Sequence, residues 1–204
     1  MNGKTARLFR ANLGADNPVF GQVLGICSTL AVTNVLKNTL IMCLGLLFTM
    51  ALSSVTVSLL RRLMPARVRM MAEVLIISAY VIFFDILLKA FLPDISRQLG
   101  PYVGLIITNC IVMGRAEAFA LANPPGLSLA DAVSSALGYS YVLLIIAFVR
   151  ELLGAGAVWG VRVLGDGWTN WTILIMAPGA FFVLAVFVWI VKGAVLARSR
   201  EAKS

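Results

Sequence analysis

The sequence contains no histidine and only three cysteines among its 204 residues. The absence of histidine removes the usual zinc and haem ligand and the ordinary catalytic base. An odd number of cysteines in an apolar chain does not form a disulfide framework. Any soft metal bound by this chain would therefore need cysteine thiolates as ligands.

Charged residues are also scarce, at 13%, whereas hydrophobic residues make up 60% of the chain. An average soluble domain is ~45–50% apolar and about 25% charged. A soluble fold of this length would leave much of its apolar surface in water. The composition therefore predicts an integral membrane protein. The net charge of +8 does not indicate nucleic-acid binding, because the basic residues lie between apolar segments and at the chain ends.

Motifs for catalysis and nucleotide binding are missing as well. The sequence has no phosphate loop, no G-x-S-x-G nucleophile turn and no dinucleotide fingerprint after a strand. The first sixteen residues are polar and irregular, which does not fit a signal peptide. If this chain takes part in catalysis, the substrate chemistry is expected on another polypeptide.

Six segments are long and apolar enough to cross a bilayer, which takes about 20 residues. They cover about 18–36, 39–61, 69–92, 101–121, 131–153 and 171–195. We therefore predict an all-α membrane protein of six transmembrane helices, forming a single membrane domain over 1–204. A basic turn at 60–67 and a turn at 123–126 separate spans, and a Gly-rich interfacial loop with Trp159 and Trp168 is expected at 154–170.

The basic residues are distributed unequally between the two sides that six spans would create. One side holds twelve of the seventeen: Lys4, Arg7, Arg10, Arg61, Arg62, Arg67, Arg69, Arg115, Lys192, Arg198, Arg200 and Lys203. The other five are Lys37, Lys89, Arg97, Arg150 and Arg162. The positive-inside rule places both termini in the cytoplasm.

An internal repeat is the most informative pattern. The spacing P-x-x-G-x5-C occurs at Pro18, Gly21 and Cys27, and it recurs 83 residues later, ending at Cys110. The copies open spans one and four, so the halves, about 18–92 and 101–195, would run through the membrane in opposite directions. Transport folds use such inverted repeats, with a site at the midplane between broken helices. Chance coincidence of three residues is the alternative.

Cys27 and Cys110 each lie nine residues after a proline, about 13.5 Å along a helix. Small and hydrogen-bonding neighbours suit half-helices that are interrupted at the cysteine, where freed backbone groups need partners. Two thiolates supply half of the four-cysteine set of a [2Fe–2S] cluster, so another polypeptide would have to complete it. The alternatives are buried packing cysteines, as expected for Cys43, or a Cys27–Cys110 disulfide, which is less favoured inside a bilayer.

Intramembrane acids form a second candidate group, because a carboxylate in hydrocarbon is costly and marks an ion or proton path by default. Asp85 in the third span is the best candidate, with an ion pair to Lys89 four residues on as the competing interpretation. Asp131 at the start of the fifth span is a candidate too, or a helix cap. Arg150 and Glu151 are expected at the interface, and Arg115 and Glu117 are expected to pair with another helix.

The segment Gly104–Ala120, which contains TNCIVMGRAEAFA, resembles a known family signature. The similarity is to the small six-helix subunits of the Na+-translocating NADH:quinone oxidoreductase and the Rnf complex, the NqrDE/RnfAE family. Residues 24–33, 150–154 and 177–182 match further landmarks, so the resemblance runs across nearly the whole chain. Residues 85–90 and 94–99 resemble the D-type subunits of the oxidoreductase most closely, with the E-type subunit of Rnf as the alternative.

The resemblance implies a multisubunit enzyme of the bacterial inner membrane. It implies a homologous E-type partner of opposite orientation and a [2Fe–2S] cluster shared between the two subunits, with Cys27 and Cys110 as this chain's ligands. FAD, covalent FMN and riboflavin would reside in other subunits, ubiquinone would accept the electrons, and sodium export would be coupled to that flow. Asp85 and Asp131 match the family's membrane acids. A secondary transporter and a structural scaffold are the other hypotheses.

Overall fold

The computed structural model describes residues 24–65, 67–91, 93–158, 161–162 and 176–201, which form helices joined by short turns and one small β-ladder. The helices are α3 (Ile26–Val32), α4 (Leu36–Leu60), α5 (Arg69–Phe91), α6 (Pro93–Ile107), α7 (Cys110–Arg115), the π-helix η1 (Ala116–Ala120), α8 (Pro125–Ala155) and α10 (Ala177–Glu201). Strand β1 (Ala157–Val158) pairs antiparallel with β2 (Val161–Arg162). The predicted helical class is confirmed.

Four helical stretches of the described residues are long and apolar enough to cross a membrane: Leu36–Leu60, Arg69–Phe91, Tyr102–Ala120 and Pro125–Gly154. They correspond to the second to fifth predicted spans. Within the sixth, 171–195, residues from 176 on are described and contain the shorter apolar helix Pro178–Gly193. The predicted span 18–36 lies partly outside the described residues, and so do Trp159 and Trp168 of the predicted interfacial loop.

Helix α8 begins six residues before the predicted start of the fifth span. Pro124 is the N-cap, with extended backbone, and Pro125 is the first helical residue. Proline suits that position, because the first N–H groups of a helix have no partner within the helix and proline has no N–H to leave unpaired. Asp131 therefore lies well inside the helix, and the expectation that it opens or caps the fifth span is wrong.

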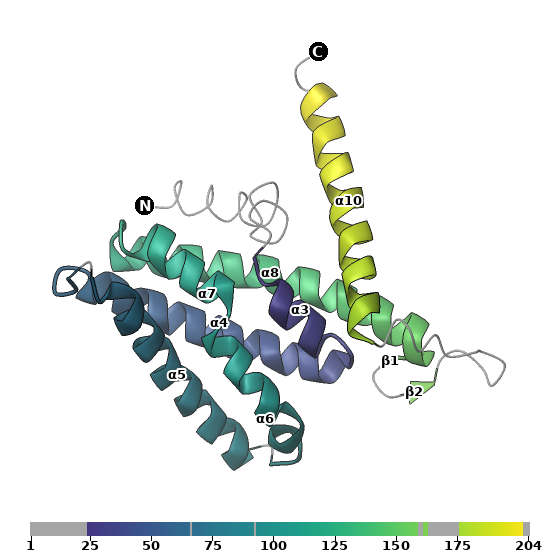
Figure 1. Cartoon of the computed structure of the whole chain (residues 1–204), viewed down its shortest axis with the longest axis horizontal. Coiled ribbons are helices and arrows are strands. Elements are labelled where there is room, and N and C mark those ends of the chain that lie inside the picture. Colours follow the sequence, from purple (N-terminus) through teal and green to yellow (C-terminus); the bar gives the residue numbers. More distant parts are fainter. Residues whose placement is uncertain (1–23, 66, 92, 159–160, 163–175, 202–204) are drawn as a thin grey trace.

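Helices α4 and α8 lie side by side and form the centre of the fold (Figure 1). Buried hydroxyl residues are concentrated on these two helices: Thr39, Thr49, Ser53, Ser54, Ser58, Ser128, Ser134 and Ser135. Some of these hydroxyls donate a hydrogen bond to a carbonyl of their own helix, as Thr49 Oγ1 does to Gly45 at 2.8 Å. Ser58 Oγ instead donates to the Asn123 carbonyl at 2.7 Å. Small hydroxyl residues allow close helix approach in a bilayer, where lipid chains already solvate apolar side chains.

Helix α5 shows the opposite distribution, with large apolar side chains on its outer surface. Met71 is 76% exposed, Leu75 69% and Phe91 76%, whereas Glu73, Ile77 and Val81 are buried. A soluble monomer rarely exposes a continuous apolar surface of this kind. The outward side of α5 is therefore suited to lipid or to another membrane subunit.

The C-terminal side of α8 is connected to the rest of the fold through two buried charged residues. Arg150 donates hydrogen bonds to Thr33 Oγ1 and to the Met176 carbonyl, and Glu151 accepts one from the Leu36 amide at 2.6 Å. Both side chains are buried within the protein, and their expected depth at the membrane interface stays a prediction. They hold the short turn between α3 and α4, where backbone groups would otherwise lack partners.

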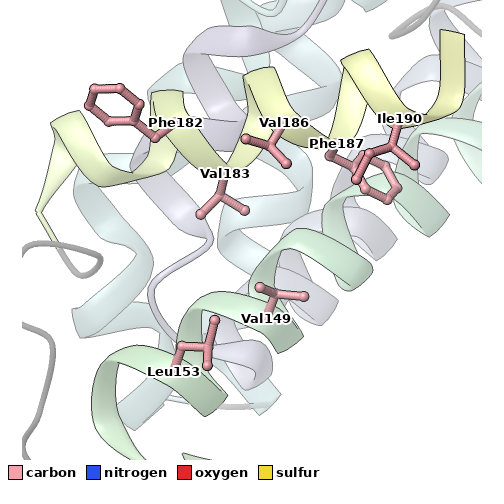
Figure 2. Close-up of a pocket in the computed structure, with 7 residues that line it drawn as sticks. All are labelled: Val149, Leu153, Phe182, Val183, Val186, Phe187 and Ile190. Carbon is pink, nitrogen blue, oxygen red and sulfur yellow. The ribbon is translucent and has the colours of Figure 1, made fainter. Parts of the chain in front are cut away.

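Helix α10 contacts α3 and α8 and then extends away from the other helices (Figure 1). The hollow between α8 and α10 is shown in Figure 2, and its lining residues are Val149, Leu153, Phe182, Val183, Val186, Phe187 and Ile190. All seven side chains are hydrocarbon. This hollow therefore offers no side-chain ligand for an ion or a redox group.

The contact between α4 and α5 can be tested at Gly45. A Cβ atom at residue 45 would lie 2.6 Å from Cε1 of Phe84. We expect Gly45→Ala to lower the free energy of unfolding by about 1–3 kcal/mol, because overpacking displaces the ring or the helix. The measurement is thermal unfolding in detergent. The control is Gly193→Ala, where a Cβ would meet no atom within 4 Å. Equal midpoints for the two variants would contradict this packing.

Candidate functional site: a cysteine pair at two helix interruptions

The two predicted ligand residues, Cys27 and Cys110, come together in the structure. The Gly25 amide donates a hydrogen bond to Cys110 Sγ at 2.9 Å, and the Cys27 and Cys110 side chains lie close enough to interact. Cys27 is the second residue of α3 and Cys110 is the first residue of α7. Each thiol therefore lies at the beginning of a short helix.

Helix α7 begins directly after the helix interruption that the sequence predicted near Cys110. Helix α6 ends at Ile107 and α7 begins at Cys110, and Asn109 between them has extended backbone. The Asn109 side-chain oxygen accepts a hydrogen bond from the Ile111 amide at 3.1 Å. That bond caps α7 and supplies a partner for one of the amides that the break leaves free.

The first helix start depends on a glycine. Gly25 has a φ of 83° and precedes α3, a conformation that disfavours residues with a Cβ atom. A Cβ at this position would also lie 2.5 Å from Cε2 of Tyr139. Glycine thus allows the chain to turn against Tyr139 while its amide points to the Cys110 sulfur.

Tyr139 of α8 connects the two interruptions, and the sequence analysis did not identify it. Its side chain is fully buried, its hydroxyl donates to the Gly25 carbonyl at 2.9 Å, and it also hydrogen-bonds Ser28 Oγ. Asn109 Nδ2 donates to the same Ser28 oxygen at 3.2 Å. The sequence feature that could have identified it is a tyrosine inside an apolar span, because a buried tyrosine hydroxyl needs a hydrogen-bond partner.

The pair can supply two thiolate ligands and one amide donor. Both thiols are free; Cys27 is exposed and Cys110 is half-buried. Among the described residues, no group of three or more His, Cys, Asp or Glu is placed to hold a metal. A [2Fe–2S] cluster takes four cysteine ligands, and hydrogen bonds to its sulfurs tune its potential. The arrangement fits half of such a site, with Cys27 accessible to a second chain.

Cys43 is placed differently from the pair. It is buried in α4 within the main hydrophobic core, and its thiol interacts with Ser140 of α8. This environment agrees with the expected packing role. Cysteine in such a position acts as a small hydrophobic residue.

Asp131 is held in a buried ion pair with Arg115. The Arg115 Nε atom donates to Asp131 Oδ2 at 2.9 Å, and an Nη atom contacts the other carboxylate oxygen, so the contact is bidentate. The Asp131 side chain is 2% exposed and that of Arg115 is 11% exposed. The expectation that Arg115 pairs with another helix is confirmed, and its partner is this candidate acid.

Asp85 forms the competing ion pair that the sequence suggested. Lys89 Nζ lies 2.6 Å from Asp85 Oδ2, and the lysine side chain is 64% exposed. The pair lies near the end of α5, which finishes at Phe91. Lys89 in the last turn also complements the negative end of the helix dipole.

A third membrane acid, Glu73 of α5, was not singled out from the sequence. It is completely buried, and neither carboxyl oxygen has a hydrogen-bond partner among the described residues. Glu117 lies beside it and pairs with Arg69. The sequence did indicate an acidic residue within the predicted span 69–92. Its position close to the basic turn at 60–67 made it look like part of the polar end of that span.

We expect Tyr139→Phe to weaken the junction around the cysteine pair. The change removes the hydroxyl that bonds Gly25 and Ser28, and a buried polar group left without its partner costs about 1–3 kcal/mol. The thermal unfolding midpoint should fall, and alkylation of Cys110 by a maleimide should become faster. Tyr141→Phe is the control, because Tyr141 is 61% exposed on the same helix. Equal Cys110 alkylation rates in the two variants would argue against the junction.

Replacing Asp131 by asparagine should lower the free energy of unfolding much more than the same change at Asp85. Asp131→Asn leaves the buried Arg115 guanidinium without its charge partner, and breaking a buried pair in this way costs about 3–5 kcal/mol. Asp85→Asn leaves a lysine that is 64% exposed and can move away from the protein interior, so the loss should be smaller than for Asp131→Asn. Unfolding of the purified protein in detergent measures both. A larger loss for Asp85→Asn would refute this ranking.

Comparison with known proteins agrees with a membrane protein. Residues 5–188 match the family model described as "Rnf-Nqr subunit, membrane protein". The D-type subunit of Na(+)-translocating NADH-quinone reductase from Pseudomonas aeruginosa is 46% identical over 85% of this chain and 80% of its own length. The proteins of the same name from Photobacterium profundum and Pseudoalteromonas translucida are 47% and 45% identical, each over 87% of both chains. The chain belongs to the Rnf-Nqr family of membrane subunits.

Proposed function

We propose that this chain is the D-type membrane subunit of a Na+-transporting NADH:quinone reductase and relays electrons through an iron–sulfur cluster. The observation that carries the proposal is the meeting of Cys27 and Cys110 at two helix interruptions, with the Gly25 amide on the Cys110 sulfur. The names of the relatives support membership of such a complex. The cluster's [2Fe–2S] composition comes from the family resemblance.

The chain's own residues would hold one side of that cluster. Cys27 and Cys110 would each provide one thiolate, and the Gly25 amide would stabilise the negative charge on the second sulfur. When bound, the cluster would supply one-electron transfer, which no side chain of this protein performs alone. The segments that carry the two cysteines would be held in place relative to each other by the hydrogen bonds among Tyr139, Ser28 and Asn109.

Two thiolates require a second donor chain, and we infer a homologous E-type subunit as that partner. The interrupted helix at Cys110 and the helix start at Cys27 support an inverted repeat of two three-span halves. Such a chain would have six spans and both termini in the cytoplasm of a bacterium. A homologue inserted the other way would present its own two cysteines toward the exposed Cys27.

This subunit would not bind the substrates of the complex. The sequence has no nucleotide fingerprint, and the described residues place no other redox ligand set beside the thiols. NADH oxidation, the FAD, FMN and riboflavin groups and the reduction of ubiquinone would belong to other subunits. The contribution of this chain is thus electron passage across the membrane interior.

Asp131 and Asp85 would contribute to ion passage in different ways. Asp131 is buried and already neutralised by Arg115 of α7, so an ion would have to compete with a bidentate guanidinium. Asp85 has an exposed lysine partner that can move away without leaving a buried charge. Asp85 is therefore the acid that a sodium ion could reach at the lower cost.

The relay is tested by replacing each cysteine in the intact complex. We expect Cys27→Ala and Cys110→Ala each to lower the iron content and stop quinone reduction, because the remaining thiolate cannot take the place of two ligands. NADH oxidation by an artificial acceptor should continue, since it uses other subunits. Elemental analysis and electron paramagnetic resonance of the purified complex measure the iron.

The matched control for these variants is Cys43→Ala, which removes a buried thiol from the core without touching the pair. It should keep its iron and its quinone reduction. If Cys27→Ala or Cys110→Ala also kept both, the chain would be a scaffold rather than a relay. Solute transport by the reconstituted chain alone would instead favour a secondary transporter.

A further inference from the structure

Glu73 is a buried carboxyl group with no hydrogen-bond donor among the described residues. Its side chain is completely buried in the second turn of α5, and neither Oε1 nor Oε2 accepts a hydrogen bond within the described part of the chain. An ionised carboxylate in such a position loses its hydration and gains nothing in return. The group therefore requires a proton, a hydrogen-bond donor or a ligand that supplies positive charge.

A second carboxyl group lies beside Glu73. Glu117 of η1 lies against Glu73, within reach of a side-chain hydrogen bond, and its Oε2 atom is buried and unpartnered among the described residues. The other oxygen of Glu117 pairs with Arg69 at a half-exposed position. Two carboxylates are both acceptors, so a hydrogen bond between them needs one proton.

Other charged groups near this cluster are already occupied. On α7 and α8, Arg115 and Asp131 neutralise each other. Arg61, at the end of α4, directs an Nη atom to the Leu121 carbonyl at 3.5 Å. Arg69 is thus the cation that faces the carboxyl pair in the described part of the chain, and one guanidinium balances only one of two carboxylates.

We propose that Glu73 and Glu117 bind one proton between them, forming a proton-binding site of this subunit that is separate from the cysteine pair. Like charges at a short separation cannot both ionise readily, so one carboxyl of such a pair keeps its proton. The Glu73 hydroxyl would donate to Glu117 Oε2, and Arg69 would hold the ionised Glu117. The absence of histidine from the chain leaves carboxyl groups as the side chains able to serve this role.

The backbone at Glu117 supports a functional site. Residues Ala116–Ala120 form a π-helical turn directly after α7, and the Leu121 amide bonds the Ala116 carbonyl at 3.3 Å. Single π-turns inside helices are rare and occur often at functional positions. The wider turn gives the Glu117 side chain a different direction from that of a regular α-helix, here toward α5.

The pair has a route for exchange with its surroundings. The Arg69 and Glu117 side chains are 37% and 36% exposed, whereas Glu73 lies beneath them. On the outer side of α5, the neighbouring side chains Met70, Met71, Val74 and Leu75 line an apolar hollow with Met113. A proton would therefore enter through the Arg69–Glu117 ion pair rather than through the apolar outer surface.

The test is infrared spectroscopy of the native membrane complex, isolated through a tag on this chain at pH 7 in choline buffer. A carboxyl in water is ionised at that pH, so a protonated side chain gives a separate carbonyl stretching band. We expect one such band per chain, sensitive to D2O and absent from Glu73→Gln. Glutamine donates an N–H to Glu117 in place of the shared proton, which preserves the contact. Asp85→Asn is the matched control and should retain the band.

A second variant covers the case in which Glu73→Gln does not assemble. Glu117→Asp shortens the acceptor side chain by one methylene and so weakens the hydrogen bond from the Glu73 hydroxyl. The Glu73 carbonyl band should therefore remain but change frequency. The proposal is overturned if the band survives Glu73→Gln, or if Glu117→Asp leaves its frequency unchanged. Disappearance of the band when sodium replaces choline would also overturn it and identify a sodium site instead. None of these readouts depends on iron or on quinone reduction, so the proposed relay is tested separately.

Discussion

The hydrogen bond from the Gly25 amide to the Cys110 sulfur joins two segments that are 85 residues apart. Helix interruptions in a bilayer leave backbone groups without water, so each needs a partner inside the protein. At this site the partners are a cysteine sulfur, the side chain of Asn109 and the hydroxyl of Tyr139. The interactions that make the interruptions tolerable also bring the two thiols together. Redox chemistry and fold stability would thus depend on the same contacts.

Helix α8 carries residues of three polar clusters in the described part of the chain. From one end to the other it carries Asp131 against Arg115, Tyr139 against the cysteine segments, and Arg150 and Glu151 against the turn before α4. Its long contact with α4 is rich in buried hydroxyl residues, which permit close packing in lipid. A single rigid helix therefore fixes the positions of three polar clusters that lie at different heights along it.

Sequence patterns predicted the helical class, the pairing of Cys27 with Cys110 and the helix break before Cys110, because span length and repeat spacing depend on local chemistry. They misjudged Asp131, since Pro124 and Pro125 indicated a turn although proline also starts helices. They also overlooked Tyr139, because its hydrogen-bond partners are distant in sequence and hydropathy and spacing do not reveal such partners.

The membrane acids of this chain fall into two physical classes. Asp131 and Asp85 each have a basic partner, so their charges are compensated within the subunit. Glu73 has no hydrogen-bonded basic partner among the described residues, and its charged neighbour on η1 is itself acidic. A compensated acid can remain ionised, whereas an uncompensated buried acid is favoured in its protonated, neutral form. The position of the basic partners therefore separates the two aspartates, whose charges are balanced within the subunit, from Glu73, for which we propose a proton shared with Glu117.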